Sequence, residues 1–456
     1  MAIATINPAT GDVLKRYARL APEELEARLA ATAPTFALWR KASVSARAAV
    51  VAQASEILEH EKEAFGALMT LEMGKPLRAA IEEAQKCSGG CRHYAQHAQR
   101  YLAEDTVLEA SGARERVLYK PLGAVLAVMP WNFPFWQAIR FAAPALVAGN
   151  VVLLKHAASV PQCALALEDL FRRAGAPAGV FQTLLVESDM VEAIIADPRV
   201  AAVTLTGGDR AGRAVAAAAG RHLKKCVLEL GGSDPFIVLP SADLDRAVET
   251  AVRARIVNNG QSCIAAKRFF VSAEIAGPFT ERFVAAMAAL KVGDPTRSDT
   301  DVGPLATASV RADLAEQVRR SVEAGARVLT GGHAIDRPGF FYAPTVLGDV
   351  PPDAPAARDE LFGPVAAVWA VANLDEAIGR ANDSPFGLAA AVWTRERDEA
   401  ERAVQELECG IVFVNGMVAS DARYPFGGIK QSGFGRELGG FGLREFVNIK
   451  RVRVAL

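Results

Sequence analysis

The 456-residue sequence has few cysteines, no excess of charge and no long apolar run. Its six cysteines are too sparse for a disulfide framework and are typical of a reducing compartment. Fifty-one basic residues balance 52 acidic ones, so no strong field attracts a polyanion and nucleic acid is not expected as a partner. A membrane helix needs about 18 uninterrupted apolar residues, which no stretch offers. Residues 1–8 also lack the features of a signal peptide, so we expect a cytoplasmic protein with no membrane partner.

One group of potential metal ligands occurs in the first quarter of the chain. Cys87, Cys91, His93 and His97 lie close together in the sequence, but they lack an established zinc spacing. A helical surface with scattered Cys and His is the favoured interpretation, and no bound metal is expected.

A chain of this length exceeds the roughly 250 to 300 residues that one hydrophobic core can serve, so two or three domains are expected. Residues 22–100 show helical periodicity. Short apolar runs then alternate with helical stretches, which predicts parallel sheets covered on both faces in an α/β fold. The runs form two units, joined near Gly231-Gly232: 124–129, 151–154, 201–205 and 227–230, then 236–239, 269–271 and 411–414.

Two segments have a different pattern. Residues 107–120 form two polar-alternating arms around Ser111-Gly112, which indicates a β-hairpin that needs a partner for stability. Residues 446–456 also alternate, as in an edge strand. From the pattern alone, that strand could pair with another subunit or with its own domain.

In parallel sheets, ligands bind beyond the carboxyl ends of the strands, and the residues there are polar or glycine. Asn132, Lys155 and Glu229 lie at or just after three of the predicted strands. Thr206-Gly207-Gly208, followed by Gly212, could place backbone N–H groups beside a pyrophosphate. Taken singly, such a glycine turn often serves only to turn the chain, and such a lysine is often simply solvated.

Cys263 is the candidate nucleophile. It follows residues 260–262 in a turn where a cysteine could be partly exposed and electropositive enough to act as a thiolate. A lone cysteine is more often inert packing. The amide of Asn132, the carboxylate of Glu229 and the phosphate-type turn, all at strand ends or turns, favour the catalytic interpretation.

Six motifs give the chain a family resemblance over nearly its whole length. They are PWNFP at 130–134, TGG with Gly212 at 206–212, LELGG at 228–232, GQSC at 260–263, ELFGP at 360–364 and PFGGIKQSGFGRE at 425–437. Together, in this order and spacing, they resemble the aldehyde dehydrogenase superfamily.

The resemblance implies three parts, and a homodimer or homotetramer. A modified Rossmann domain for the cofactor would comprise residues 1–103 and 123–231, and an α/β catalytic domain residues 232–425. A small β oligomerisation element would comprise residues 104–122 and 426–456, which include the predicted hairpin and terminal strand.

The family chemistry is oxidation of an aldehyde to a carboxylic acid through a cysteine thiohemiacetal and a thioester. By resemblance, Cys263 is the nucleophile, and Asn132 with the Cys263 backbone N–H forms the oxyanion hole. Glu229 is the base that activates water, a task that needs a carboxylate with a raised pKa. Glu437 matches a carboxylate of the proton relay, whereas Phe141 replaces a lysine that is common in that relay.

The resemblance also implies an NAD(P) site. Glu360 and Phe362 match residues that hold the nicotinamide ribose and ring, Lys155 matches an adenosine-ribose contact, and Trp131 lies along the cofactor cleft. Ala158 stands where NAD-preferring relatives often have a glutamate. Without that anion nothing repels a 2′-phosphate, so we expect NADP to be used, with NAD also accepted.

The substrate expectation is succinate semialdehyde. Arg140 matches an arginine that binds the substrate carboxylate in succinate-semialdehyde dehydrogenases, and a guanidinium suits that group. Ser420 falls near a serine that serves the same end. Without the resemblance, an ion pair with a core carboxylate explains Arg140 equally well. Val257 replaces a second arginine of that pocket, for which Arg255 or Arg423 could substitute. Residues 155–157 and 232–235 are similar to a compact bacterial subgroup with this substrate.

Three alternatives remain open from the sequence. The substrate could be a neutral aliphatic or aromatic aldehyde. A coenzyme-A-acylating semialdehyde dehydrogenase is disfavoured because those relatives typically lack the base at Glu229. A non-catalytic structural protein with this fold is disfavoured because Cys263, Asn132 and Glu229 are all present.

Overall fold

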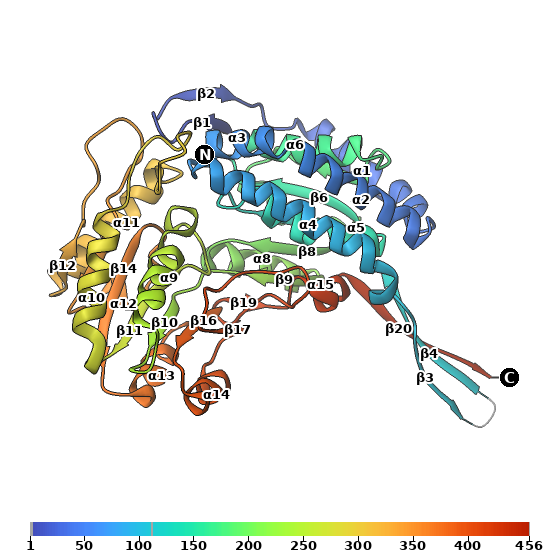
Figure 1. Cartoon of the computed structure of the whole chain (residues 1–456). Helices are drawn as coiled ribbons and strands as arrows, with labels where there is room; N and C mark the ends of the chain where they lie inside the picture. The colour runs from blue at the N-terminus through green and yellow to red at the C-terminus, as the bar shows by residue number, and fades with distance from the viewer. Residues whose placement is uncertain (1–2, 111–112, 456) are drawn as a thin grey trace.

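Two parallel β-sheets, one from each half of the chain, organise the structure (Figure 1). This computed structural model describes residues 3–110 and 113–455. The α/β class predicted from the alternating apolar runs is confirmed, because those runs form strands of the two sheets.

Helices form the N-terminal region, as the periodicity of residues 22–100 predicts. They follow a short antiparallel pair, β1 (Ala4–Ile6) and β2 (Val13–Arg16). The Ser43 side chain accepts a hydrogen bond from the Ala46 N–H and caps the second helix. Gly74, in a left-handed conformation at φ 80°, ends the third. The four helices are α1 (Pro22–Trp39), α2 (Val44–His60), α3 (Lys62–Met73) and α4 (Leu77–Tyr101).

Helix α4 contains the cysteines and histidines that could have suggested a metal. The helix was predicted correctly, but Cys87 and Cys91 are fully buried in the core rather than at a surface. The rings of His93 and His97 stack on each other at 4.5 Å. Within residues 3–110 and 113–455, no three His, Cys, Asp or Glu side chains are grouped so that they could hold a metal ion.

The first sheet has the strand order β19-β9-β8-β5-β6-β7, with β19 antiparallel to the rest. Its strands are β5 (Ala124–Met129), β6 (Val151–His156), β7 (Phe181–Thr183), β8 (Val200–Thr206), β9 (Lys225–Glu229) and β19 (Gly433–Phe434). The connecting helices are α5 (Trp136–Ala148), α6 (Pro161–Arg173), η1 (Ser188–Met190), α7 (Val191–Ala196) and α8 (Asp209–Arg221). Because β6 and β8 flank β5 on opposite sides, the order reverses there, and such a switch point opens a crevice at the carboxyl ends.

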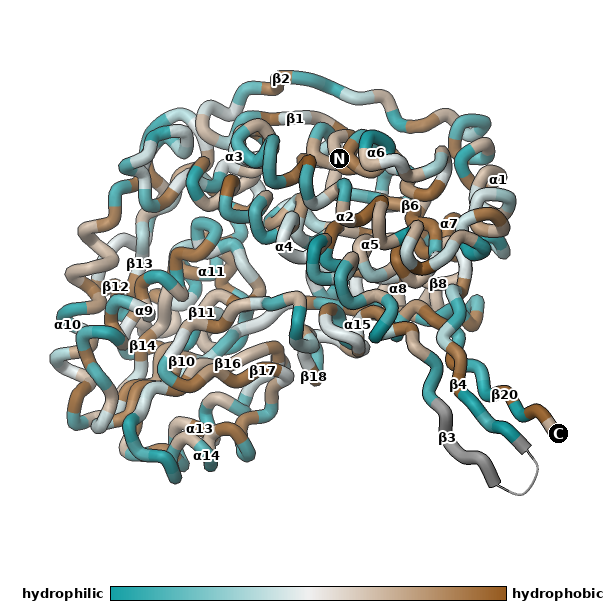
Figure 2. The backbone as a smooth tube through the Cα atoms, turned by 45° about the vertical axis from the view of Figure 1, so that its right-hand side comes forward, coloured by the Kyte–Doolittle hydropathy of each residue, from teal (hydrophilic) through white to brown (hydrophobic). Residues whose placement is uncertain are grey.

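The second sheet has the order β12-β13-β14-β11-β10-β16-β17, with β12 antiparallel. Its strands are β10 (Asp234–Val238), β11 (Ala266–Ser272), β12 (Arg327–Thr330), β13 (Thr345–Gly348), β14 (Val365–Val371), β16 (Ala389–Trp393) and β17 (Ile411–Val414). Its helices are α9 (Leu244–Ile256), η2 (Val257–Gly260), α10 (Ala273–Ala288), α11 (Ala308–Glu323), α12 (Pro355–Arg358), α13 (Leu374–Asn382) and α14 (Arg397–Glu406). Figure 2 shows the hydrophobic colouring of β10, β16 and β17. Every residue of β10 and β16 is buried, as is typical of strands covered on both faces, whereas the edge strand β17 is partly exposed.

A three-stranded sheet projects from the body of the molecule (Figures 1 and 2). It contains β3 (Asp105–Ala110), β4 (Ala113–Pro121) and β20 (Val447–Ala455), and the short helix α15 (Gly439–Glu445) precedes β20. Both arms of the predicted hairpin are therefore strands, although its turn at residues 111–112 lies outside the described residues. The terminal strand pairs with β4 of its own chain, one of the two alternatives left open by the sequence.

The C-terminal segment also returns to the first sheet. Strand β18 (Ile429–Lys430) pairs with β15 (Phe386–Gly387), and β19 pairs with β9 so that Gly433 lies opposite Glu229. One strand of the predicted oligomerisation element is thus part of the first sheet. Within residues 3–110 and 113–455, no helix is long and apolar enough to cross a membrane.

Candidate active site

A pocket of about 620 Å³ lies at the carboxyl ends of the first sheet, where β5 and β8 end. We call it the first pocket. Trp131 and Phe362 meet edge to face across it, with ring centroids 5.6 Å apart. Among its other lining residues are Asn132, Gln137, Thr206, Gly207, Gly208, Cys263 and Glu360. Most residues that the sequence assigned to cofactor binding therefore line this pocket.

A second pocket of about 550 Å³ shares Cys263 and Gln137 with the first. Its wall is mainly apolar, and its polar lining residues include Lys86, Arg140 and Ser420. The predicted substrate residues Arg140 and Ser420 thus lie in one cavity with the predicted nucleophile. Cys263 stands between the two cavities, where it can face a molecule in either one.

A constrained turn leads to Cys263. Asn258 and Asn259 are buried and both adopt left-handed conformations, at φ 57° and 59°, which asparagine tolerates better than most residues. The Asn258 side-chain amide donates to the carbonyls of Asn132 (2.7 Å) and Gln261 (2.9 Å), and the Asn132 amide also donates to Gln261 (3.1 Å). This network fixes Asn132 against the turn that carries the nucleophile.

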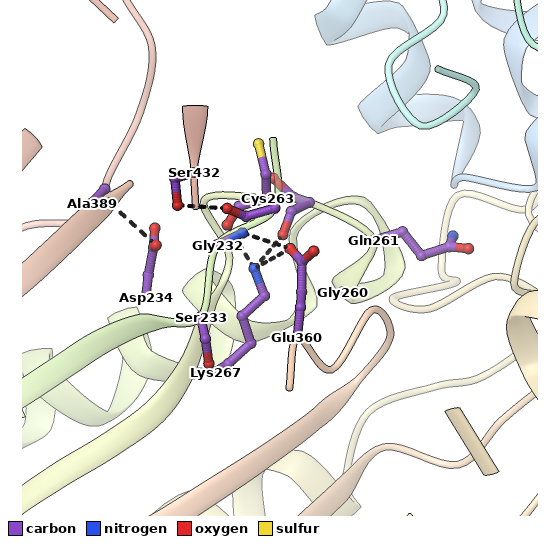
Figure 3. Close-up of polar contacts among 12 residues, drawn as sticks. Gly232, Ser233, Asp234, Gly260, Gln261, Cys263, Lys267, Glu360, Ala389 and Ser432 are labelled. Carbon is purple, nitrogen blue, oxygen red and sulfur yellow. Dashed lines mark hydrogen bonds and ion pairs between the residues drawn. The ribbon is translucent and has the colours of Figure 1, made fainter. Parts of the chain in front are cut away.

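Lys267 connects the nucleophile turn to the first pocket, as Figure 3 shows. Its fully buried ammonium group donates to the carbonyls of Ser262 (2.8 Å) and Cys263 (2.6 Å). The same nitrogen lies 3.2 Å from a carboxylate oxygen of Glu360, which also accepts from the Gly232 N–H at 3.1 Å. A single cation therefore holds both the backbone of Cys263 and the side chain of Glu360.

Gly231 and Gly232 allow Glu360 and the Cys263 carbonyl to lie close to the backbone that follows β9. A Cβ atom on Gly231 would lie 2.4 Å from a Glu360 carboxylate oxygen, and one on Gly232 would lie 2.7 Å from the Cys263 carbonyl oxygen. Any larger residue would push these groups apart. The glycine pair, which the sequence suggested as a domain junction, is thus part of the site itself.

Glu229 lies behind the pockets rather than in them. Its side chain is 2% exposed, and a Cβ atom on Gly427 would lie 2.5 Å from one of its oxygens. Burial, reinforced by the nearby Glu437 carboxylate, raises the pKa of Glu229 well above its ordinary value. Both carboxylate oxygens lack a hydrogen-bond partner among the described residues. The raised pKa agrees with a base, but in this arrangement Glu229 lines neither pocket.

Arg140 forms a buried ion pair with Glu437. It also donates to the Thr206 hydroxyl at 3.2 Å and lies over the Phe426 ring, 4.7 Å from its centroid. The ion-pair interpretation of Arg140 is therefore correct, while the residue also lines the second pocket. Glu437, predicted for the proton relay, and Arg140, predicted for the substrate, are therefore bound to each other.

The surroundings of Cys263 act on the pKa of its thiol in two opposite directions. Cys263 is only partly exposed, and burial raises the pKa of its thiol to about 12, although Arg140 and Lys267 act in the opposite direction. The partial exposure of Cys263 and the two nearby cations agree with the surroundings predicted for it, whereas burial favours the protonated thiol. Its sulfur needs a base before it can attack.

The remaining predicted cofactor residues lie farther from Cys263. Gly208 precedes helix α8, and a Cβ atom at this position would meet open space. Gly212 is buried, and a Cβ atom there would lie only 2.6 Å from the Leu230 side chain. Lys155, at the end of β6, is buried and its pKa is lowered by that burial. Lys155, Ala158 and Gly212 are not among the residues that line the first pocket.

Comparison with protein families gives one match, in which the family model for the aldehyde dehydrogenase family covers residues 1–452. The chain belongs to the aldehyde dehydrogenase family. The predicted family, fold class and activity of an NAD(P)-dependent aldehyde dehydrogenase are therefore confirmed.

Close relatives of this aldehyde dehydrogenase extend over the whole chain. It is 55% identical to succinate-semialdehyde dehydrogenase [NADP(+)] 1 of Mycobacterium tuberculosis and 53% identical to the succinate-semialdehyde dehydrogenase [NADP(+)] of Mycobacterium leprae. Each alignment covers 100% of both chains. Among solved structures, succinic semialdehyde dehydrogenase from Streptococcus pyogenes in complex with NADP+ is 36% identical, with a TM-score of 0.97 and 100% coverage of both chains.

Neither Arg255 nor Arg423 lines the second pocket, so neither substitutes for the missing second arginine of the substrate site. Arg255 is fully buried and donates to the carbonyls of Val365 and Gly260, so it supports the fold and lines neither pocket. Arg423 forms an ion pair with Asp421 in a separate cleft, which we call the outer cleft and which Lys86, Trp136 and Ser420 also line. Val257, at the position of the missing arginine, lines the second pocket as an apolar residue.

Sequence reasoning missed several residues of the enzyme's site. Lys86, on α4, reaches Ser420, which is 334 positions away in the chain. Lys267 lies close after Cys263 in the sequence, but lysines in short polar stretches are usually solvated. Gln137 lies on α5 shortly after the PWNFP motif, and Asn258 and Asn259 lie just before the GQSC motif. Proximity to these motifs was the one available signal for the glutamine and the asparagines.

Proposed function

We propose that this enzyme oxidises succinate semialdehyde to succinate with NADP as the main oxidant and NAD as a usable one. The position of Cys263 between the two pockets carries the proposal. One pocket has the glycine turn and aromatic pair suited to a dinucleotide, and the other combines an apolar wall with cations suited to a carboxylate. The names of the mycobacterial relatives agree with this substrate and cofactor.

In the first step, the thiol of Cys263 loses its proton to solvent, and its sulfur bonds to the aldehyde carbon. The carbonyl electron pair moves to oxygen and gives a thiohemiacetal oxyanion. Asn132 donates one amide hydrogen to Gln261, so its second amide hydrogen remains for that oxyanion. The Cys263 backbone N–H, for which no acceptor is found among the described residues, is the second donor.

The residues of the first pocket fit a nicotinamide nucleotide. The N-terminus of α8 and the open space at Gly208 suit a phosphate, and Glu360, held by Lys267, suits the two hydroxyls of a ribose. The chemistry that a bound nicotinamide would supply is an acceptor for the hydride, which would leave the thiohemiacetal carbon with its electron pair. Collapse of the oxyanion then leaves an acyl thioester on Cys263.

Hydrolysis of the thioester needs Glu229. Its raised pKa makes it a stronger base than an ordinary carboxylate, so it can take a proton from water as the oxygen bonds to the acyl carbon. The carbon–sulfur bond then breaks and returns Cys263. Because Glu229 lies behind the pockets, we propose that its side chain turns toward Cys263 for this step.

The substrate carboxylate would lie at the far end of the second pocket from the thiol. Arg140 and Ser420 line that cavity, and a guanidinium and a hydroxyl both donate hydrogen bonds to carboxylates. At Ala158 no carboxylate opposes a 2′-phosphate, which supports NADP.

The organisation around the site also remains a proposal. We propose a cofactor domain of residues 1–103 and 123–231, a catalytic domain of residues 232–425, and a bridging element of residues 104–122 and 426–456. The free edge of β3 and the exposed side of β20 favour a homodimer or homotetramer through that element. A cytoplasmic location agrees with the six unpaired cysteines.

Initial rates of NADPH and NADH formation test the function, with succinate semialdehyde, butanal and benzaldehyde as substrates and Cys263→Ala as the blank. We expect the highest kcat/KM for succinate semialdehyde with NADP. Faster turnover of butanal or benzaldehyde would overturn the substrate, and a clear preference for NAD would overturn the cofactor.

A further inference from the structure

Lys86 is a cation at the outer end of the second pocket. It lines that pocket together with Cys263, and it also lines the outer cleft that contains Arg423. Its ammonium group donates to the Ser420 hydroxyl at 2.7 Å and lies over the Trp136 ring, 4.7 Å from its centroid. The side chain is solvent-accessible, and the protein around it still lowers its pKa to about 8 through desolvation.

The other cations near this pocket already have acidic partners. Glu437 pairs with Arg140, and Asp421 pairs with Arg423. The acidic group nearest along α4, Glu83, pairs with the buried Lys75. Among the described residues, no carboxylate forms an ion pair with Lys86, so its charge lacks a direct counterion within that part of the chain.

An unpaired ammonium in a partly desolvated pocket favours an anionic ligand, because the ligand restores the charge balance that the protein omits. The hydroxyl of Ser420, already held by Lys86 and by the Trp136 indole N–H at 3.1 Å, can turn its own hydrogen toward the same anion. Apolar residues such as Val257 and Met417 line the same pocket. Such a wall suits the methylene carbons of a short dicarboxylic semialdehyde.

We propose that Lys86 binds the distal carboxylate of the substrate, together with Ser420, in place of the second arginine that Val257 replaces. The inference rests on the proposed oxidation of a carboxylate-bearing aldehyde. Arg140 contributes to the same field, but Glu437 offsets most of its charge. Lys86 is therefore the residue that distinguishes charged from neutral aldehydes.

The test replaces Lys86 by Met, which keeps a stem of similar length over Trp136 and removes the charge. Lys86→Arg restores a cation. Lys291→Met is the matched control, because Lys291 is an exposed lysine that lines neither the second pocket nor the outer cleft, and its ammonium group lies 4.0 Å from the Asp299 carboxylate. Steady-state kcat and KM are measured for succinate semialdehyde and butanal with NADP. Butanal turnover reports whether each variant is folded and has a working thiol.

A hydrogen bond to a charged group supports an effect of roughly 10- to 100-fold, so we expect Lys86→Met to raise the KM for succinate semialdehyde by that factor. The kcat for this substrate and both constants for butanal should change less than about threefold, well below one tenfold step in affinity. Lys86→Arg should recover most of the loss, and Lys291→Met should behave as the wild type.

Three results would overturn the inference, and they differ in what they imply. If the wild type prefers succinate semialdehyde and Lys86→Met keeps that preference, the carboxylate is bound elsewhere and the proposed function stands. If the wild type prefers butanal, the proposed substrate fails and the role of Lys86 fails with it. Equal losses for both aldehydes would also overturn it, because Lys86 would then support the pocket without recognising the carboxylate.

Discussion

Lys267 and Glu360 form an ion pair of 3.2 Å, and the same lysine donates to the Cys263 carbonyl oxygen. The lysine is fully buried, whereas the Glu360 side chain is 18% exposed and lines the first pocket. The turn that carries the nucleophile and the carboxylate predicted to bind the nicotinamide ribose are therefore held by one group. A change at Glu360 should therefore affect the turn that carries Cys263, and a change in that turn should affect Glu360.

A double-mutant cycle should detect this coupling. Lys267→Met leaves buried acceptors unsatisfied and should cost about 3 kcal/mol of stability. When Glu360→Gln is already present, the cost should fall by about 1 kcal/mol or more, because the lysine has lost its ionic partner. Chemical denaturation of the four proteins measures this difference, and strictly additive losses would contradict the coupling.

Glu229 should make the enzyme less stable as pH rises. Burial and Glu437 raise its folded-state pKa above the ordinary value of 4.5, so the unfolded chain ionises first. Between these two pKa values the folded state binds more protons, and its stability falls with increasing pH. Glu229→Gln does not titrate, so its melting temperature relative to wild type should rise as pH increases from about 4.5. A constant difference from about pH 4 to 8 would contradict this result.

Cys263 should react slowly with alkylating agents at neutral pH. The thiol pKa of about 12 leaves little thiolate, so the rate of modification by iodoacetamide should rise about tenfold per pH unit between about pH 7 and 10. Mass spectrometry of the peptide that contains Cys263 measures the rate, with Cys263→Ala as the blank. A rate that levels off below about pH 8 would mean that the thiolate is already formed.

Replacing Arg140 should damage turnover of every aldehyde. Arg140→Met leaves Glu437 buried and unpaired, a change that typically costs about 3 to 5 kcal/mol. It also removes the cation that lowers the pKa of Glu229. Steady-state rates should therefore fall for both succinate semialdehyde and butanal, unlike in Lys86→Met. A loss confined to succinate semialdehyde would show that Arg140 acts mainly on the carboxylate.

Local sequence patterns predicted the frame of the molecule well. The runs at 124–129 and 411–414 coincide with β5 and β17. Of the residues noted at the strand ends, Asn132 and residues 206–208 line the first pocket, whereas Lys155 and Glu229 do not. These features depend on neighbours in the chain. An apolar run marks a buried strand, and the carboxyl ends of parallel strands necessarily meet at one edge.

The partners of charged side chains could not be predicted in the same way. Arg255 was a reasonable candidate for the substrate pocket, yet its guanidinium donates hydrogen bonds to the carbonyls of Val365 and Gly260. Lys86 carried no signal because the Ser420 hydroxyl belongs to a segment far along the chain. Arg140 on α5 likewise pairs with a residue of the C-terminal motif. Such contacts depend on tertiary packing, about which helical periodicity and motif spacing carry no information.

The most direct test of the account is to trap the acyl-enzyme. Glu229→Gln lacks the base for hydrolysis, so after mixing with succinate semialdehyde and NADP it should release one NADPH per active site and then stop. Mass spectrometry should find a succinyl group on the peptide that contains Cys263. Steady turnover without a trapped acyl group, or an acyl group on another cysteine, would contradict the proposed roles of Cys263 and Glu229.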